Sequence, residues 1–115
     1  MPIITFRTNL ASEKLSEDFH LALSAKLAEA LGKPEERVSV TVETDCRMSR
    51  GGSLDPVCEI HVASIGLDTR EKTLPVASTI TSFLTKYTGV PPTRIVMTFR
   101  PLQPYLVAVN GVLMG

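Results

Sequence analysis

Hydrophobic and polar residues follow two different periods along this chain. Residues 2–8 and 38–43 alternate between apolar and polar positions, which is typical of a strand with one buried face. From about Ser16 to Leu31 the apolar positions recur at helical spacing, and a second stripe of the same kind ends at Gly89. The two stripes consist of Phe19, Ala22, Leu23, Leu27 and Ala30, and of Val76, Ile80, Phe83, Leu84 and Tyr87. The pattern therefore predicts strands that alternate with two amphipathic helices.

Both predicted helices carry signals at their ends. Ser16 can cap the free backbone N–H groups at the start of the first helix, and Gly32 allows a left-handed stop before Pro34. In the second helix Thr73 is the predicted cap. Pro75 is then expected in the first turn, where its missing N–H costs little.

One half of the chain repeats the other. A shift of 57 residues carries 32–42 onto 89–99, with glycine, proline, arginine and threonine in register, and it also carries Ile3 onto Ile60. We therefore predict one domain over residues 1–115 that contains an internal repeat of 2–44 and 59–101.

Two strand–helix–strand units in one small domain predict an α/β (α+β) fold. Right-handed crossovers place both helices on one face of a four-stranded sheet. The other face would carry Val96 and Thr98 without a covering helix, and residues 105–115 predict a C-terminal hairpin around Asn110, apolar on both arms. Exposed apolar surface of this size usually marks an interface. We therefore expect a closed homo-oligomer in which sheets pack through the helix-free face.

Composition and charge exclude several classes of function. Twelve basic residues balance twelve acidic ones and form no basic run, which argues against nucleic acid as a partner. The chain has no apolar stretch of membrane-spanning length and no secretory signal, so we expect no membrane insertion and a cytoplasmic location.

The residues that most often carry chemistry do not form a familiar set. Cys46 and Cys58 lack the spacing of a metal site and are expected to be free thiols. His20 and His61 lie on different predicted elements, so no metal site and no serine–histidine–aspartate set is expected. Residues 51–53 lack the spacing of a phosphate-binding loop and favour a flexible turn.

Pro2 is the position with the clearest chemical potential. If Met1 is removed, the chain begins with a secondary amine. Because Pro2 opens a predicted strand of the core, the fold would hold that nitrogen rigidly.

With these motifs assembled, the whole chain resembles the family of macrophage migration inhibitory factor and D-dopachrome tautomerase. The motifs that carry the resemblance are Pro2, Thr8-Asn9-Leu10, Gly32-Lys33-Pro34, Gly51-Gly52-Ser53, Asp55-Pro56 and Ser64-Ile65-Gly66. Residues 99–104 look more like the D-dopachrome tautomerase branch. The resemblance implies a homotrimer with a tautomerase pocket between subunits, Pro2 as the catalytic residue and no cofactor.

The chemistry of a tautomerase suits these residues. A base must take a proton next to a carbonyl and return it elsewhere, and an amine with a pKa near neutrality can do both. Burial and a nearby cation, for which Lys33 is the candidate, would lower the pKa of the Pro2 amine. Lys33 would also bind the carboxylate of a carbonyl substrate or the developing enolate oxygen. The resemblance adds Ser64 and Ile65 to the substrate-binding residues.

The chain also departs from the migration-inhibitory-factor pattern. Val96 and Thr98 replace a tyrosine and an asparagine that the adjacent subunit contributes to the pocket, and Val109 replaces a pocket tryptophan. Thr98 can still donate a hydrogen bond, and Arg37 or Arg100 is a candidate anchor for an anion. The paired cysteines linked to redox activity are also missing, so thiol oxidoreductase activity is not expected.

Two functions from different classes follow. The first is an enzyme, a tautomerase of phenylpyruvate or dopachrome type that uses Pro2. The second is a cytokine-like protein, exported without a signal peptide, whose surface binds a receptor and whose pocket is a relic. A structural α/β oligomer without activity is the third reading.

Overall fold

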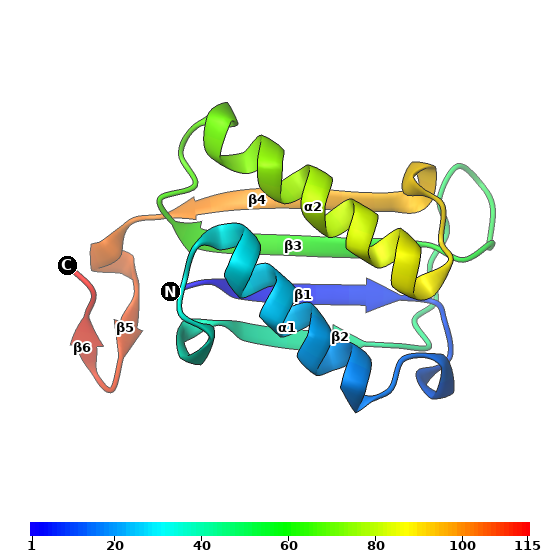
Figure 1. Cartoon of the computed structure of the whole chain (residues 1–115), viewed down its shortest axis with the longest axis horizontal. Coiled ribbons are helices and arrows are strands. Elements are labelled where there is room, and N and C mark those ends of the chain that lie inside the picture. The colour runs from blue at the N-terminus through cyan, green and yellow to red at the C-terminus, as the bar shows by residue number, and fades with distance from the viewer.

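The fold is a four-stranded mixed sheet with two helices packed on one face (Figure 1). The computed structural model describes all residues, 1–115. The strands are β1 (Ile3–Thr8), β2 (Ser39–Glu43), β3 (Cys58–Ile65) and β4 (Ile95–Leu102), and the helices are α1 (Glu17–Leu31) and α2 (Arg70–Thr88). Across the sheet the order is β2-β1-β3-β4, with β1 parallel to β2, antiparallel to β3, and β3 parallel to β4. The predicted fold class is confirmed. Neither helix is both long and apolar enough to span a membrane.

The two halves of the chain contain the same elements in the same order. Each helix ends at a glycine with left-handed backbone, φ 64° at Gly32 and φ 79° at Gly89. A short 3-10 helix follows each time, η2 (Glu35–Arg37) and η3 (Pro92–Arg94), and it leads into the parallel edge strand. The shift of 57 residues carries η2 onto η3, so the sequence repeat is also a repeat of structure.

The start of α2 differs from the prediction. The helix begins at Arg70 with Thr69 in the capping position, and the backbone N–H of Thr73 donates to the Thr69 carbonyl. Thr73 is therefore inside the helix and is not its cap. Pro75 is the sixth helical residue and lies beyond the first turn. Position Ser16 does precede α1 as predicted, although its side chain makes no capping hydrogen bond.

The core lies between the sheet and the helices. Alternate residues of β1 and β3 face the helices, and those of α1 and α2 face the sheet. Phe19 packs against Phe6 and Tyr87, with ring centroids 5.4 and 5.1 Å apart. The fully buried side chains are Ile4, Phe6, Phe19, Leu23, Leu27, Val57, Ile60, Val62, Val76, Ile80, Leu84 and Val90.

The helix-free face of the sheet is more polar than the sequence analysis assumed. Strand register places Thr5 beside Thr41 and His61, and places Arg7 beside Glu43 and Glu59. The Nε of Arg7 lies 2.6 Å from the Glu43 carboxylate. Val96 and Thr98 lie on this face as predicted, among charged and hydroxyl side chains that pair along its rows.

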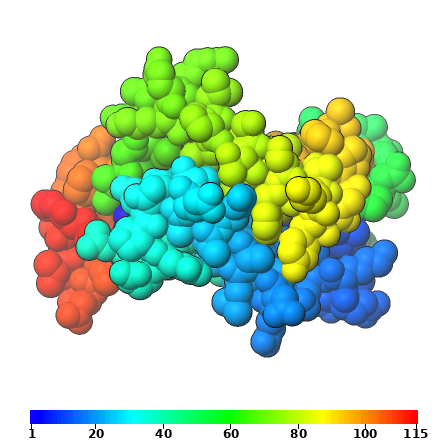
Figure 2. Space-filling view, viewed as in Figure 1, coloured from blue at the N-terminus to red at the C-terminus, as the bar shows by residue number.

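Apolar exposure is concentrated in the C-terminal hairpin. Strands β5 (Ala108–Val109) and β6 (Val112–Leu113) pair across Asn110 and Gly111, both with positive φ. This is the backbone geometry of a tight hairpin turn. The hairpin lies at one end of the molecule, away from the layer of sheet and helices (Figures 1 and 2). Its exposed apolar side chains are Val109, Val112, Leu113 and Met114, with Tyr105 and Leu106 just before it.

Candidate functional site

Pro2 is buried and held at the start of β1. Its carbonyl accepts a hydrogen bond from the backbone N–H of Ser39 at 3.0 Å. Since Ile3 pairs with Ala63 in antiparallel register, Pro2 lies beside Ser64 at the carboxyl end of β3. Neighbouring chain segments at β2 and β3 therefore flank Pro2, as expected for a residue that opens a core strand.

The charge around the chain start is positive. In the structure the terminal amine is that of Met1, one residue before Pro2. Its pKa is lowered first by loss of hydration, then by repulsion from Lys33 and from Arg37. A neighbouring cation disfavours the protonated amine and so favours its basic form at lower pH.

Lys33 stands at this position because α1 stops just before it. Gly32 adopts the left-handed conformation, and the backbone N–H of Lys33 bonds back to the Ala28 carbonyl at 3.0 Å. This pairing satisfies a free carbonyl in the last turn of the helix. Pro34 then leads the chain away into η2. The lysine is thereby held between the end of α1 and the sheet.

A cavity of about 430 Å³ lies at this end of the molecule. Lys33 closes one side of it, and Ser64 and Ile65 at the end of β3 form another. Three of the predicted substrate-binding residues are thus brought together. Ser64 is buried and its hydroxyl lies 3.4 Å from the Ile65 carbonyl.

The same cavity includes residues that the sequence analysis missed. Glu71, Lys72 and Pro75 line it from the first turns of α2. The Nζ of Lys72 is paired with Asp68 at 3.1 Å, one helical turn earlier. These residues escaped prediction because the helix was expected to start at Thr73. A helix capped by Thr69, with the Asp68–Lys72 pair at i,i+4 spacing as its signal, would have placed them at the pocket.

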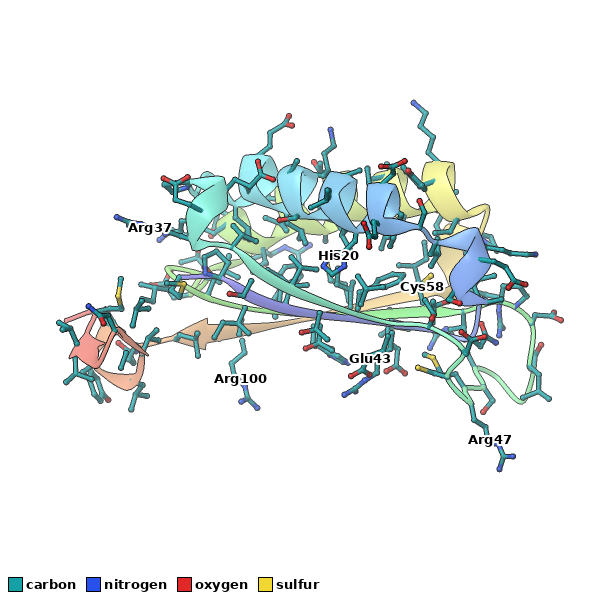
Figure 3. All side chains as sticks on the ribbon, turned by 90° about the horizontal axis from the view of Figure 1, so that it is seen from below. His20, Arg37, Glu43, Arg47, Cys58 and Arg100 are labelled. Atoms are coloured by element: carbon teal, nitrogen blue, oxygen red, sulfur yellow. The ribbon has the colours of Figure 1, made fainter.

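The remaining predicted site residues lie elsewhere in the single chain. Val96, Thr98 and Arg100 belong to β4 and face the helix-free side, opposite the Lys33 cavity. Figure 3 shows Arg37 on the helix side and Arg100 on the other. Thr98 and Arg100 line a second cavity, of about 260 Å³, with Ile3 and Thr5. One chain therefore carries two parts of the predicted site on opposite faces.

The two repeat-related arginines have different surroundings. Arg94 donates hydrogen bonds to the carbonyls of four loop residues, namely Arg50, Ser53, Asp55 and Pro56, at 2.9 to 3.3 Å. Arg37, its counterpart in the first half, makes no such side-chain bond and is exposed beside the chain start. Arg94 is a structural residue, whereas the charge of Arg37 is free to meet an anion.

Asn9 completes the attachment of the loop. Its side-chain amide donates to the carbonyls of Leu54 and Asp55, both at 3.1 Å, and its carbonyl accepts from the N–H of Val57 at 2.9 Å. Residues 51–53 form the predicted turn, closed by backbone hydrogen bonds between Arg50 and Ser53, and the Asn9 and Arg94 bonds hold the loop around it.

The cysteines do not form a reactive pair. Both are free, and Cys58 is buried, which raises the pKa of its thiol. No group of three or more histidine, cysteine, aspartate or glutamate side chains is arranged to hold a metal ion.

The chain has clear relatives. The family model for macrophage migration inhibitory factor matches residues 1–115. The chain is 38% identical over 111 residues to the MIF-like protein mif-2 of Caenorhabditis elegans, covering 96% of this chain and 92% of that protein. It is 36% identical over 115 residues to D-dopachrome decarboxylase-B of Xenopus laevis, covering 99% and 98%.

Solved structures agree with the sequence relatives. Macrophage migration inhibitory factor from Oncomelania hupensis superposes with a TM-score of 0.93 at 29% identity, covering all of this chain and 83% of that one. The homologue from Prochlorococcus marinus gives 0.89 at 28% identity, with 98% and 99% covered. The resemblance noted in the sequence thus extends over the full length in both sequence and fold. The chain belongs to the macrophage migration inhibitory factor family.

Proposed function

We propose that the protein is a tautomerase that interconverts keto and enol forms of a carbonyl substrate bearing a carboxylate, with Pro2 as general acid and base. The observation that carries this proposal is the buried chain start beside two unneutralised cations, Lys33 and Arg37. An amine whose pKa is lowered by burial and neighbouring cations suits a group that must take up and release a proton.

The proposed reaction needs only one proton to move. After removal of Met1, the unprotonated Pro2 nitrogen takes a proton from the carbon next to the carbonyl, and an enolate forms. The protonated amine then returns that proton to the other end of the enolate. No oxidant or cofactor enters, because atoms and electrons balance within the substrate.

Each residue of the cavity has a role in this reaction. The ammonium of Lys33 binds the substrate carboxylate or stabilises the enolate oxygen as negative charge develops there. Ser64 and Ile65 also line the cavity, and Arg37 adds a second positive charge near the chain start. The name D-dopachrome decarboxylase, carried by the Xenopus laevis relative, agrees with a substrate that has a carboxylate.

We also propose that the working form is a homotrimer. Its support is the division of the candidate residues between opposite faces of one chain, with Val96 and Thr98 remote from Lys33. In a closed ring the helix-free face of one subunit meets the cavity of the next. Val96 and Thr98 of an adjacent subunit then complete the pocket around Pro2.

The direct test is a tautomerase assay on purified protein whose N-terminus has been verified by mass. Phenylpyruvate and D-dopachrome are the two substrates to compare. A variant with one residue inserted between Met1 and Pro2, which turns the Pro2 nitrogen into an amide, is the control for the base. The proposal expects turnover of at least one substrate and its loss in the variant. Turnover that is the same in both proteins would contradict it.

A further inference from the structure

The imidazole of His61 lies between a carboxylate and a hydroxyl on the helix-free face. Nδ1 of His61 is hydrogen bonded to Oγ1 of Thr98 on the neighbouring strand. Nε2 of His61 lies 3.6 Å from Oε1 of Glu59 on the same strand. The proposed tautomerase reaction gives no role to Glu59 or His61.

The hydroxyl of Thr98 faces a place where a ligand can bind. His61 and Thr98 line the cavity of about 260 Å³ together with Thr5, Ile3 and Arg100. The guanidinium of Arg100 has no hydrogen-bond or ion-pair partner in the chain and points away from the sheet (Figure 3). A small cavity with one free cation, hydroxyl groups and an apolar side chain suits the oxygen atoms of a carboxylate or enolate.

We propose that His61 is a positioning residue that determines whether Thr98 donates a hydrogen bond to the ligand. This inference rests on the proposed function, in which Thr98 reaches the pocket of an adjacent subunit. It adds a pH-dependent donor to that site.

The protonation state of His61 determines whether the Thr98 hydroxyl can donate a hydrogen bond to a ligand or can only accept one. In the neutral imidazole, a proton on Nε2 is directed at Glu59, so Nδ1 accepts the Thr98 hydroxyl proton. The Thr98 oxygen can then only accept a bond from a ligand. In the imidazolium, Nδ1 donates to the Thr98 oxygen, and the hydroxyl proton becomes free to bind an anionic oxygen.

The direction in which pH changes ligand affinity follows from this exchange of donor and acceptor between His61 and Thr98. Ligand affinity through Thr98 is greater when His61 is protonated, and it falls when rising pH deprotonates the imidazole. The charged groups facing His61 are Glu59 on β3, Arg100 on β4, and Arg7 on β1, which is itself paired with Glu43 on β2.

The test measures binding of 3-phenylpropanoate, a carboxylate without a keto group, by calorimetry between pH 5.5 and 8. We expect His61→Gln to lose a component of about tenfold in affinity at low pH, the usual size of a hydrogen bond to a charged group. Thr98→Val should lose the same component, and the double variant should lose no more.

Thr41→Val is the matched control, since this hydroxyl lies in the same row of the sheet on the edge strand β2. It should leave both the affinity and its pH profile unchanged. Folding of each variant is checked by thermal unfolding. A pH step that persists in His61→Gln, with Thr98→Val unchanged, overturns the inference even if Pro2-dependent turnover is intact. Absence of that turnover in the wild-type protein would instead contradict the proposed function.

Discussion

At the scale of single residues, the decisive feature is an amine among cations. Lys33 and Arg37 both lower the pKa of the chain-terminal amine, after the larger effect of burial. A nearby positive charge makes protonation of the amine less favourable, and so the amine is a free base over a wider range of pH. Pro2 lies deeper than Met1, so the processed chain should feel these effects more strongly.

The first prediction concerns the Pro2 nitrogen. Inserting one residue between Met1 and Pro2 turns this nitrogen into an amide, which has no basicity. Tautomerase activity should fall by at least about a hundredfold, the usual contribution of a general base. The melting temperature should stay close to that of the wild type. Equal turnover by the extended and processed proteins would show that another group is the base.

The second prediction concerns the pH profile. The rate should rise with pH through a step below about 7.7, the ordinary α-amine value, because the unprotonated amine is the active form. Lys33→Ala should move this step to higher pH and weaken binding of carboxylate substrates. Arg37→Ala should move the step in the same direction by a smaller amount, since its effect on the amine ranks below that of Lys33.

Turnover rates of the wild type, Lys33→Ala and Arg37→Ala between pH 5 and 9 would check that the Lys33 variant shifts the step further than the Arg37 variant. Neither variant should bring the step up to the value of a free amine, because burial remains the largest cause. If the activity steps of both variants lie at the same pH as that of the wild type, Lys33 and Arg37 do not act on the base.

At the scale of elements, the long loop between the halves is attached mainly through the side chains of Asn9 and Arg94. The guanidinium of Arg94, in η3, donates to four loop carbonyls and so holds residues 50–56 against the start of β4. The repeat makes the comparison with Arg37 informative, since the two occupy the same position in η3 and η2.

The third prediction uses this pair. Arg94→Ala should lower the free energy of unfolding by about 2 kcal/mol, because several charge-assisted hydrogen bonds to backbone are lost. Arg37→Ala should change it by less than about 0.5 kcal/mol, as is usual for an exposed side chain without partners. Urea unfolding followed by circular dichroism measures both. A similar loss in the two variants would refute the assigned structural role of Arg94.

At the scale of the whole molecule, a single chain leaves apolar side chains exposed and leaves the predicted pocket residues apart. The hairpin exposes Val112, Leu113 and Met114, and the predicted pocket residues lie on two faces. The proposed ring of subunits would cover the exposed hairpin and would bring the two sets of pocket residues together. The polar rows of the helix-free face imply that the interior of such a ring is hydrated and is not a dry core.

The fourth prediction joins assembly to activity. Deleting residues 106–115 should destabilise the oligomer and lower turnover together, because the hairpin and the shared pocket depend on the same contacts between subunits. Light scattering and the tautomerase assay on the same sample would check both. A well-folded, fully active monomer would contradict the shared site, whether or not Pro2 is the base.

Much of the fold could be predicted from the sequence because its signals are local. Alternation marks β1 and β2, and helical spacing marks α1. The glycines at 32 and 89 end each helix because they adopt positive φ, and the repeat then orders the elements. The chemical roles of Pro2 and Lys33 came from the family resemblance, and they are tested by the predictions above.

Only the tertiary structure decided how distant residues meet. The start of α2 at Arg70 brings Glu71 and Lys72 to the Lys33 cavity, although Pro75 suggested a later start. Strand register pairs Arg7 with Glu43 and lines up Glu59, His61 and Thr98, which no spacing along the chain reveals. The physical reason is that these contacts join residues on different strands, and their partners are set by which strands pair and in which register.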